Sequence, residues 1–272
     1  MGTQPLLPIK SSSNRNIVRV RELIMKSRAR KEMKAFVAEG ERFVNDIPAE
    51  KIMELFVSES YINSGRKIPE NDCSIYCLPD SLMKTVSDTD NPQGILAVVS
   101  DPSEPMEEIV NRAFAEKKNP LFLVLCGIQD PGNLGTMCRT AEGAYADGII
   151  MSGDTCDPLS PKAARASMGS MTRVPFCRLS PGELTGCLSF LKERKVSLLA
   201  AYLEGSHVYS DVDMRGATAI LIGNEGNGLK RETADMADMK IRIPMGGQLE
   251  SLNAAVSAAV IMYEAYRQRS ES

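Results

Sequence analysis

Residues 121–141 read Leu-Phe-Leu-Val-Leu-Cys-Gly-Ile-Gln-Asp-Pro-Gly-Asn-Leu-Gly-Thr-Met-Cys-Arg-Thr-Ala, an apolar run that enters a Gly- and Pro-rich turn and then a helical pattern. Short apolar runs recur downstream, with helix signals between them, at 148–151, 173–176, 196–201 and 219–222. Strand-length apolar runs that alternate with helices indicate an α/β domain with a mostly parallel sheet. Open sheets of this kind bind ligands at the carboxyl ends of their strands, so we expect the site in those loops.

The residues before this domain carry a second, smaller α/β pattern. It predicts helices at 17–27, 41–46 and 79–86, and strands at 35–37, 54–57, 74–78 and 95–99. An acidic, Pro-rich break at 101–105 and a helical stretch at 106–117 follow. We therefore expect a first domain over 1–102, a linker over 103–118 and a second domain over 119–272.

Composition excludes several classes of protein. Of the 272 residues, 43% are hydrophobic and 25% are charged, as in soluble globular proteins. The longest strongly apolar run, 121–128, is far shorter than the roughly 20 residues that span a bilayer. No apolar stretch follows a basic N-terminus, as it would in a secretory signal. We expect a cytoplasmic protein with no membrane segment.

Cysteine and histidine usage argues against a metal site. The seven cysteines include no C-x-x-C pair, which is typical of free thiols in a reducing compartment. His207 is the only histidine, and we expect it in a surface loop. A His-based zinc site, a Ser-His-Asp triad and a Cys-His dyad would all depend on this one residue. We therefore expect no metal.

A basic segment near the N-terminus is a candidate nucleic-acid contact. The net charge of the chain is −3, yet residues 10–42 contain ten Lys or Arg against four Glu. Such a segment fits either a polyphosphate partner or a solvated helix face, and charge alone does not decide between them. The candidate RNA-binding residues are Arg28, Arg30 and Lys31.

Three Gly- or Pro-rich turns follow strands in the second domain. In the first, within 121–141, Asn133 and Arg139 lie near the start of a helix, where an anion is favoured. The second, 220–229, reads Ile-Leu-Ile-Gly-Asn-Glu-Gly-Asn-Gly-Leu, and the third, 241–255, reads Ile-Arg-Ile-Pro-Met-Gly-Gly-Gln-Leu-Glu-Ser-Leu-Asn-Ala-Ala. None of the three turns has the residue spacing of a P-loop or of a dinucleotide-binding fingerprint. Each turn could be purely structural or part of a site.

Helix starts in the second domain have capping signals. Ser160 precedes Pro161, and Ser180-Pro-Gly-Glu183 has the spacing of a capping box. A last helix is expected over 252–268, with Ser251 as its N-cap. Asn253 is less expected there, because Asn is a poor residue for a helix interior.

These three turns, in this order, resemble the three motifs of the SpoU branch of the SPOUT class of RNA methyltransferases. The resemblance covers residues 120–268. The first domain carries Ser13-Asn-x-x-Ile17 and Phe36-Val-x-Glu-Gly40, and with these it resembles the small ribosomal-protein-like domain that precedes the catalytic domain in ribosomal-RNA members. One departure is Ala144-Tyr-Ala-Asp-Gly148, where many members carry Phe-Gly-Ala. The residues that carry the resemblance are Asn133, Gly135 and Arg139-Thr-Ala, then Gly223-Asn-Glu-Gly226, then Ile243-Pro-Met and Ser251-Leu-Asn-Ala.

The resemblance implies a fold and a reaction. The fold is an α/β knot, a mostly parallel sheet with a deep C-terminal trefoil knot, that binds S-adenosylmethionine and forms a homodimer through the catalytic domain. In the reaction, a ribose 2′-hydroxyl of RNA attacks the methyl carbon of S-adenosylmethionine, so the protein mainly positions the reactants. A guanidinium is a poor base. The implied role of Arg139 is therefore to hold a phosphate and stabilise developing alkoxide charge, with proton removal left open.

The resemblance also implies the other site residues. Asn133, Glu225, Ser251 and Asn253 join Arg139 in the catalytic constellation. Cofactor contacts are expected mainly from backbone, and they involve Ala201, Gly223, Asn224, Gly226, Ile243, Pro244, Met245 and Leu252.

The ribosomal-protein-like first domain favours large-subunit (23S) ribosomal RNA as the substrate. A transfer-RNA methyltransferase, an enzyme that protects the ribosome from an antibiotic, and a non-catalytic RNA-binding protein on the same fold are the alternatives.

Overall fold

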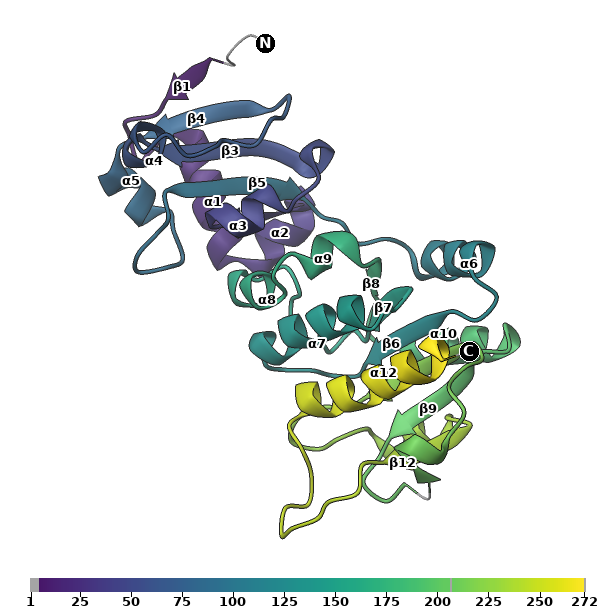
Figure 1. Cartoon of the computed structure of the whole chain (residues 1–272). Coiled ribbons are helices and arrows are strands. Elements are labelled where there is room, and N and C mark those ends of the chain that lie inside the picture. The colour runs from purple at the N-terminus through teal and green to yellow at the C-terminus, as the bar shows by residue number, and fades with distance from the viewer. Residues whose placement is uncertain (1–4, 206, 272) are drawn as a thin grey trace. The chain divides into compact units, whose positions relative to one another are not determined.

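Two β-sheets organise the chain, one in each of two units (Figure 1). The computed structural model describes residues 5–205 and 207–271. The first unit holds the chain up to Pro102 together with Asp157–Thr172, and the second holds Ser103–Cys156 and the chain from Arg173 onward. The stretch 103–118, expected as a linker, contains helix α6 (Met106–Glu116), which packs within the second unit.

The first unit has a mixed five-stranded sheet. Its order is β1 (Leu6–Pro8), β4 (Ser74–Leu78), β3 (Ile52–Ser58), β5 (Ile95–Ser100) and β2 (Ala35–Glu39). The first three strands run parallel, and β5 is antiparallel to both β3 and β2. Its helices are α1 (Arg15–Met25), α2 (Ser27–Met33), α3 (Glu41–Asn45), α4 (Glu59–Asn63), α5 (Asp80–Thr85) and α8 (Pro161–Ala166), with a 3-10 turn, η1, at Ala49–Lys51.

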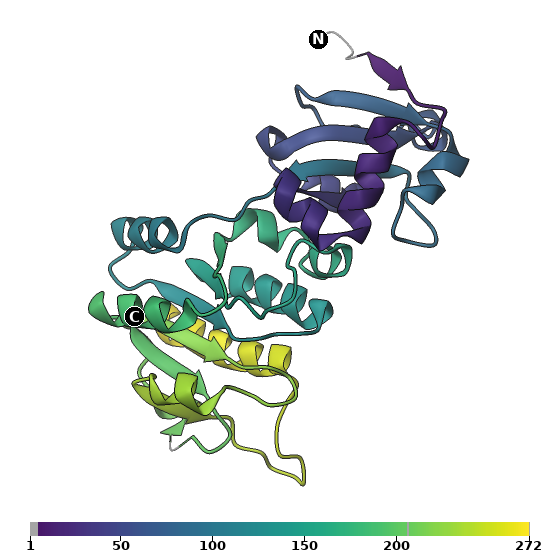
Figure 2. The same cartoon turned by 180° about the vertical axis from the view of Figure 1, so that it is seen from behind.

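Helix α1 lies across this sheet (Figure 2). The side chain of Asn14 caps its start by accepting from the amide of Asn16 at 2.9 Å. Ile17, Val20 and Leu23 recur at helical spacing and are fully buried against strand residues. The helical pattern expected over 17–27 is therefore present, but it divides into α1 and α2 at Lys26, whose backbone is extended.

The second unit has a seven-stranded sheet in which every pairing between described strands is parallel, and the predicted mostly parallel sheet is confirmed. Its order is β10 (His207–Val208), β12 (Met239–Arg242), β9 (Ser197–Ala201), β11 (Thr218–Ile222), β6 (Leu121–Leu125), β7 (Gly148–Met151) and β8 (Phe176–Arg178). Its other elements are α7 (Pro131–Gly143), α9 (Ser170–Arg173, shared with the first unit), α10 (Leu184–Glu193), η2 (Tyr209–Asp211), α11 (Arg231–Asp235) and α12 (Ala254–Ser270).

Helices cover both faces of this sheet. All five residues of β6 are buried. Residues of α6 and α10 share one core cluster with Phe122 and Val124, whereas α7 and α12 contribute nothing to that cluster and pack together on the other face (Figure 1). Among the described residues, no helix combines the length and apolar character needed to cross a membrane.

Three local predictions need correction. The strand expected at 173–176 is β8, shifted to Phe176–Arg178, because residues 170–173 close a helical turn and Pro175 has no N–H for the ladder. Helix α10 begins at Leu184, because Gly182 has a φ of +89° and interrupts the helix expected from Ser180. His207 lies in the short edge strand β10, not in a loop, and it is exposed as expected.

Candidate functional site

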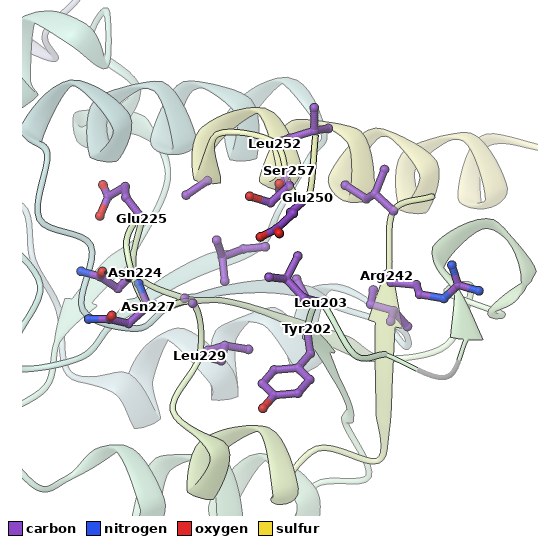
Figure 3. A pocket seen from close by; sticks show the side chains of 18 of the residues that line it. Tyr202, Leu203, Asn224, Glu225, Asn227, Leu229, Arg242, Glu250, Leu252 and Ser257 are labelled. Atoms are coloured by element: carbon purple, nitrogen blue, oxygen red, sulfur yellow. Dashed lines mark hydrogen bonds between the residues drawn. The ribbon is translucent and has the colours of Figure 1, made fainter. Parts of the chain in front are cut away.

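The three Gly- or Pro-rich turns meet at one edge of the second unit's sheet. A pocket of about 510 Å³ lies between the loops after β9, β11 and β12 and the first turn of α12 (Figure 3). All three of these strands are parallel, so their carboxyl ends meet there, as expected for an open α/β sheet.

The loop after β11 folds back on itself. The amide of Asn224 donates to the carbonyl of Gly228 at 3.1 Å, and the Gly228 amide donates back at 2.9 Å. A Cβ atom at Gly223 would lie 2.2 Å from the backbone of Gly228 and Leu229, so only glycine fits at this position. The Asn224 side chain accepts from the Gly226 amide at 2.8 Å and donates to the carbonyl of Gly127 at 2.8 Å. The loop is thus tied to the turn after β6.

Glu225 connects this loop to the start of α7. Its carboxylate accepts from Asn133 Nδ2 at 3.0 Å and from the amides of Gln129 and Asp130, each at 3.1 Å. Asn133 Oδ1 in turn accepts from Asn253 Nδ2 at 3.2 Å. One hydrogen-bonded chain, Asn253–Asn133–Glu225, therefore joins all three turns.

These donors keep Glu225 ionised. Burial acts to raise the pKa of the Glu225 carboxyl, but hydrogen bonds from Asn133 and from backbone amides outweigh it and hold the pKa below its usual range. A carboxylate that accepts several N–H bonds also fixes the donors in place. Glu225 is accordingly suited to orient Asn133.

The first turn of α7 is capped from the same region. Asp130 accepts from the amide of Asn133 at 2.9 Å, and Pro131 occupies the first helical position. Arg139 lies two turns further along, and its side chain is exposed. It makes no ion pair with any residue within 5–205 or 207–271. The guanidinium is therefore available to an anionic ligand.

Asn253, not Ser251, caps α12. Its Oδ1 accepts from the amides of Ala255 and Val256 at 2.8 and 3.3 Å, while its Nδ2 reaches Asn133. Asn253 precedes the first helical residue, Ala254, so it does not lie in a helix interior at all. This placement explains the asparagine that the sequence alone left unexplained.

A thiol nucleophile does not fit this site. Burial raises the pKa of Cys126, beside the first turn, to about 12, and that of Cys138 on α7 to about 12. All seven cysteines are free of disulfides. Among the described residues, no group of three or more His, Cys, Asp or Glu side chains could hold a metal ion.

Comparisons with known proteins match both units. Residues 120–263 match the SpoU rRNA Methylase family, and residues 14–97 match the MRM3-like substrate binding domain. The chain belongs to the SpoU rRNA methylase family.

Individual relatives extend over nearly the whole chain. The 23S rRNA (guanosine(2553)-2′-O)-methyltransferase RlmP of Bacillus subtilis is 31% identical over 258 residues, covering 94% of this chain and 97% of that protein. The 23S rRNA (guanosine-2′-O-)-methyltransferase RlmB of Vibrio parahaemolyticus is 31% identical over 81% of this chain and 92% of its own length. A crystal structure of an AdoMet-bound rRNA methyltransferase from Sinorhizobium meliloti superposes with a TM-score of 0.81 at 30% identity, covering 96% of this chain and 98% of the other.

The SpoU-type motif residues divide into two groups around the pocket. The first group lines the pocket and contains most of the expected cofactor residues, together with Glu225 and Ser251. The expected cofactor residue Pro244 does not line the pocket but lies between two residues that do, Ile243 and Met245. Asn133, Asn253 and Arg139 do not line it, although the first two reach it through Glu225. The expected cofactor residues that line the pocket are Ala201, Gly223, Asn224, Gly226, Ile243, Met245 and Leu252.

The three expected RNA contacts differ in exposure. Arg28 is exposed and pairs with Glu32 at 2.7 Å, and Lys31 is exposed. Arg30 is only 4% exposed: its guanidinium donates to the carbonyls of Leu23 and Ile24 and pairs with Asp157 at 2.8 Å. The expectation that Arg30 contacts RNA needs correction, because its side chain is buried and its Nε and Nη1 groups already bond inside the first unit.

Several polar residues of the pocket were missed by sequence reasoning. Glu204, Glu250, Arg242 and Ser257 line it beside the expected residues. Each lies within a few positions of a recognised motif residue, but no spacing rule distinguishes them from ordinary loop and helix residues. Only the folded arrangement identifies them.

Proposed function

We propose that this protein transfers a methyl group from S-adenosylmethionine to a ribose 2′-hydroxyl of 23S ribosomal RNA. The observation that carries the proposal is the Asn253–Asn133–Glu225 chain, which joins the three motif turns beside the pocket. Relatives named as 23S rRNA 2′-O-methyltransferases and an AdoMet-bound neighbour support the same reaction. A cytoplasmic location agrees with this substrate.

The pocket fits S-adenosylmethionine. Its volume of about 510 Å³ suits a small-molecule cofactor. Apolar side chains of Ile222, Leu229, Ile243 and Leu252 line it and offer apolar surface to an adenine ring, while Gly223 lets the backbone approach closely. Bound there, the cofactor supplies an electrophilic methyl group on a sulfonium. The residues assigned to hold it are Ala201, Gly223, Asn224, Gly226, Ile243, Pro244, Met245 and Leu252.

Arg139 holds the RNA at the reacting position. The 2′-oxygen forms a bond to the methyl carbon as the carbon–sulfur bond breaks and its electron pair stays on the sulfur of S-adenosylhomocysteine. The hydroxyl proton passes from the oxygen to solvent water. A guanidinium at this position neutralises a nearby phosphate and the negative charge that develops on the oxygen. Asn133, Glu225, Ser251 and Asn253 orient the groups around it.

Arg139→Ala separates chemistry from cofactor binding. We expect methyl transfer to fall by at least about 100-fold, because removing one stabilising donor typically costs that much. S-adenosylmethionine affinity, measured by calorimetry, should stay within about two-fold, because Arg139 does not line the pocket. The matched control is Arg112→Ala, which removes an exposed arginine of α6 that pairs with Glu104. Near-normal turnover of Arg139→Ala would contradict the catalytic assignment.

The first unit binds the RNA backbone through exposed cations. Arg28 and Lys31 are the candidates that remain after Arg30 is excluded. Phosphate contacts add a salt-dependent, largely sequence-independent term to affinity. The double variant Arg28→Gln/Lys31→Gln should weaken binding to 23S rRNA fragments and flatten its salt dependence. An unchanged salt slope would mean that these side chains form only a solvated helix face.

The protein forms a homodimer through α7 and α12. Tyr145, Tyr263 and Tyr266 are exposed there, with Tyr145 stacked on Tyr266 at 5.8 Å and Tyr263 edge-on to Tyr266 at 6.1 Å. Exposed aromatic clusters are typical of interface centres. Sedimentation should give about twice the 29.7 kDa of one chain at micromolar concentration, and a monomer mass would contradict the dimer. The deep trefoil knot implied by the resemblance stays a prediction.

The RNA substrate is tested directly. Mapping of 2′-O-methylation in total RNA from a strain that lacks the gene should reveal one lost site in 23S rRNA. Loss of a site in transfer RNA instead would support the transfer-RNA alternative, and loss of none, with cofactor still bound, would support a non-catalytic RNA-binding protein.

A further inference from the structure

The walls of the proposed cofactor pocket carry more negative than positive charge. Three glutamates, Glu204, Glu225 and Glu250, are among the residues that line it, against one cationic residue within the described chain, Arg242. Figure 3 shows Glu225 on the β11 loop and Glu250 near the start of α12, whereas the Arg242 guanidinium extends from β12 away from the other lining side chains. The lining therefore has a formal excess of two negative charges.

Two of these carboxylates have no partner among residues 5–205 and 207–271 to offset their charge. Glu225 accepts three N–H groups. Glu204 and Glu250, by contrast, make no hydrogen bond or ion pair with any other residue in the described part of the chain. The lysines that flank the pocket walls are engaged elsewhere, since Lys230 lies 3.8 Å from Asp154 and Lys240 pairs with Asp235. The field of Glu204 and Glu250 is thus available to a bound ligand.

The methyl donor and the demethylated product differ mainly in charge. S-adenosylmethionine carries a positive sulfonium, whereas S-adenosylhomocysteine has a neutral thioether and keeps the same amino, carboxylate and nucleoside groups. A negative potential at the sulfur therefore favours the donor over the product. Carboxylates several ångströms away in a partly solvated pocket change affinity only modestly, by about two- to five-fold each.

We propose that Glu250, assisted by Glu204, determines the preference of the pocket for the cationic methyl donor over the neutral product. The inference rests on the proposed function, and it adds a role that the motif residues do not supply. A pocket that binds donor more tightly than product releases the product after transfer. Glu250 acts here through the charge of the ligand's sulfur, not through groups that donor and product share.

Calorimetry on the full-length protein tests this proposal. Wild type, Glu250→Gln and Glu204→Gln/Glu250→Gln are titrated with S-adenosylmethionine, with S-adenosylhomocysteine and with an analogue that has a protonated amine in place of the sulfonium. We expect Glu250→Gln to weaken the two cationic ligands by about two- to five-fold and to leave the thioether unchanged. The double variant should bind the two cationic ligands more weakly still. Both effects should shrink between about 50 and 500 mM salt, because exposed charges are screened.

Glu232→Gln is the matched control, because Glu232 is an exposed glutamate on α11 that does not line the pocket. Equal losses for donor and product in Glu250→Gln would overturn the proposal, because Glu250 would then bind the shared amino or ribose groups. Unchanged affinities for all three ligands would also overturn it. If wild type binds none of them, the proposed function itself fails.

Discussion

Arg30 shows how a residue in a basic segment can serve packing instead of ligand binding. Its side chain is 5% exposed and that of its partner Asp157 is 12% exposed. The charges flanking it, Arg28 and Lys31, are exposed. Local composition cannot separate these cases, because a run of cations is compatible with either a solvated face or an internal ion pair. Only the burial of Leu23 and Ala29 beside Arg30 indicates which cation faces inward.

Arg30→Met should destabilise the protein strongly. Removing one partner of a buried ion pair leaves the other charge uncompensated, which typically costs roughly 3–5 kcal/mol. Arg28→Met, which removes only an exposed i,i+4 pair with Glu32, should cost at most about 0.5 kcal/mol. Urea unfolding followed by circular dichroism compares the two. Equal losses would contradict the buried pair.

Glu225 makes stability and active-site order depend on pH. Because its pKa in the folded protein lies below the ordinary value of 4.5, its contribution to stability is complete above pH 4.5 and is lost as the pH falls through the folded pKa. Asn133→Ala removes the main hydrogen bond that lowers this pKa. Carboxyl NMR titration should therefore show the Glu225 pKa rising in that variant. An unchanged pKa would mean that the backbone amides alone set it.

Helix starts show which capping signals can be read from sequence. The predicted start at Ser160 is confirmed, since its side chain accepts from the amide of Ala163 at 3.4 Å. The Ser180–Glu183 signal is only half realised: Glu183 accepts from the Ser180 amide at 2.7 Å, but Gly182 delays the helix to Leu184. At α12, both Ser251 and Asn253 are good N-cap residues by type. The one that caps the helix, Asn253, also makes a long-range hydrogen bond to Asn133.

Asn253→Ala should lower stability by about 1 kcal/mol through loss of the α12 cap. It should also weaken S-adenosylmethionine binding, because Ala254 and Ser257 in the first turns of α12 line the pocket. Ser251→Ala, which removes no helix cap, is the control and should change stability by less than about 0.5 kcal/mol. Thermal unfolding and calorimetry measure both effects. A larger stability loss from Ser251→Ala would mean that the cap is misassigned.

At the scale of the whole molecule, sequence predicted the sheet of the second unit well, because parallel strands buried on both faces give continuous apolar runs such as 121–125. The grouping of Asp157–Thr172 with the first unit was not predicted. This segment lies in sequence between β7 and β8, and its attachment depends on side chains far away in the chain, such as Arg30 and Lys51. Periodicity reports local structure and carries no information on such distant partners.

This grouping predicts that the amides of residues 1–102 are less protected from hydrogen exchange in the isolated fragment than in the full chain. Leu159, Ala163 and Ala164 of the added segment are buried, and Asp157 supplies the charge opposite Arg30. Without the segment, solvent reaches the guanidinium, so Arg30→Met loses no buried ion pair there. Hydrogen exchange of α1 and β2 amides should thus show a loss of roughly 3–5 kcal/mol from Arg30→Met in the full chain, and at most about 1 kcal/mol in the fragment. Equal losses of stability in the full chain and in the fragment would show that the ion pair with Asp157 does not account for the contribution of Arg30 to stability.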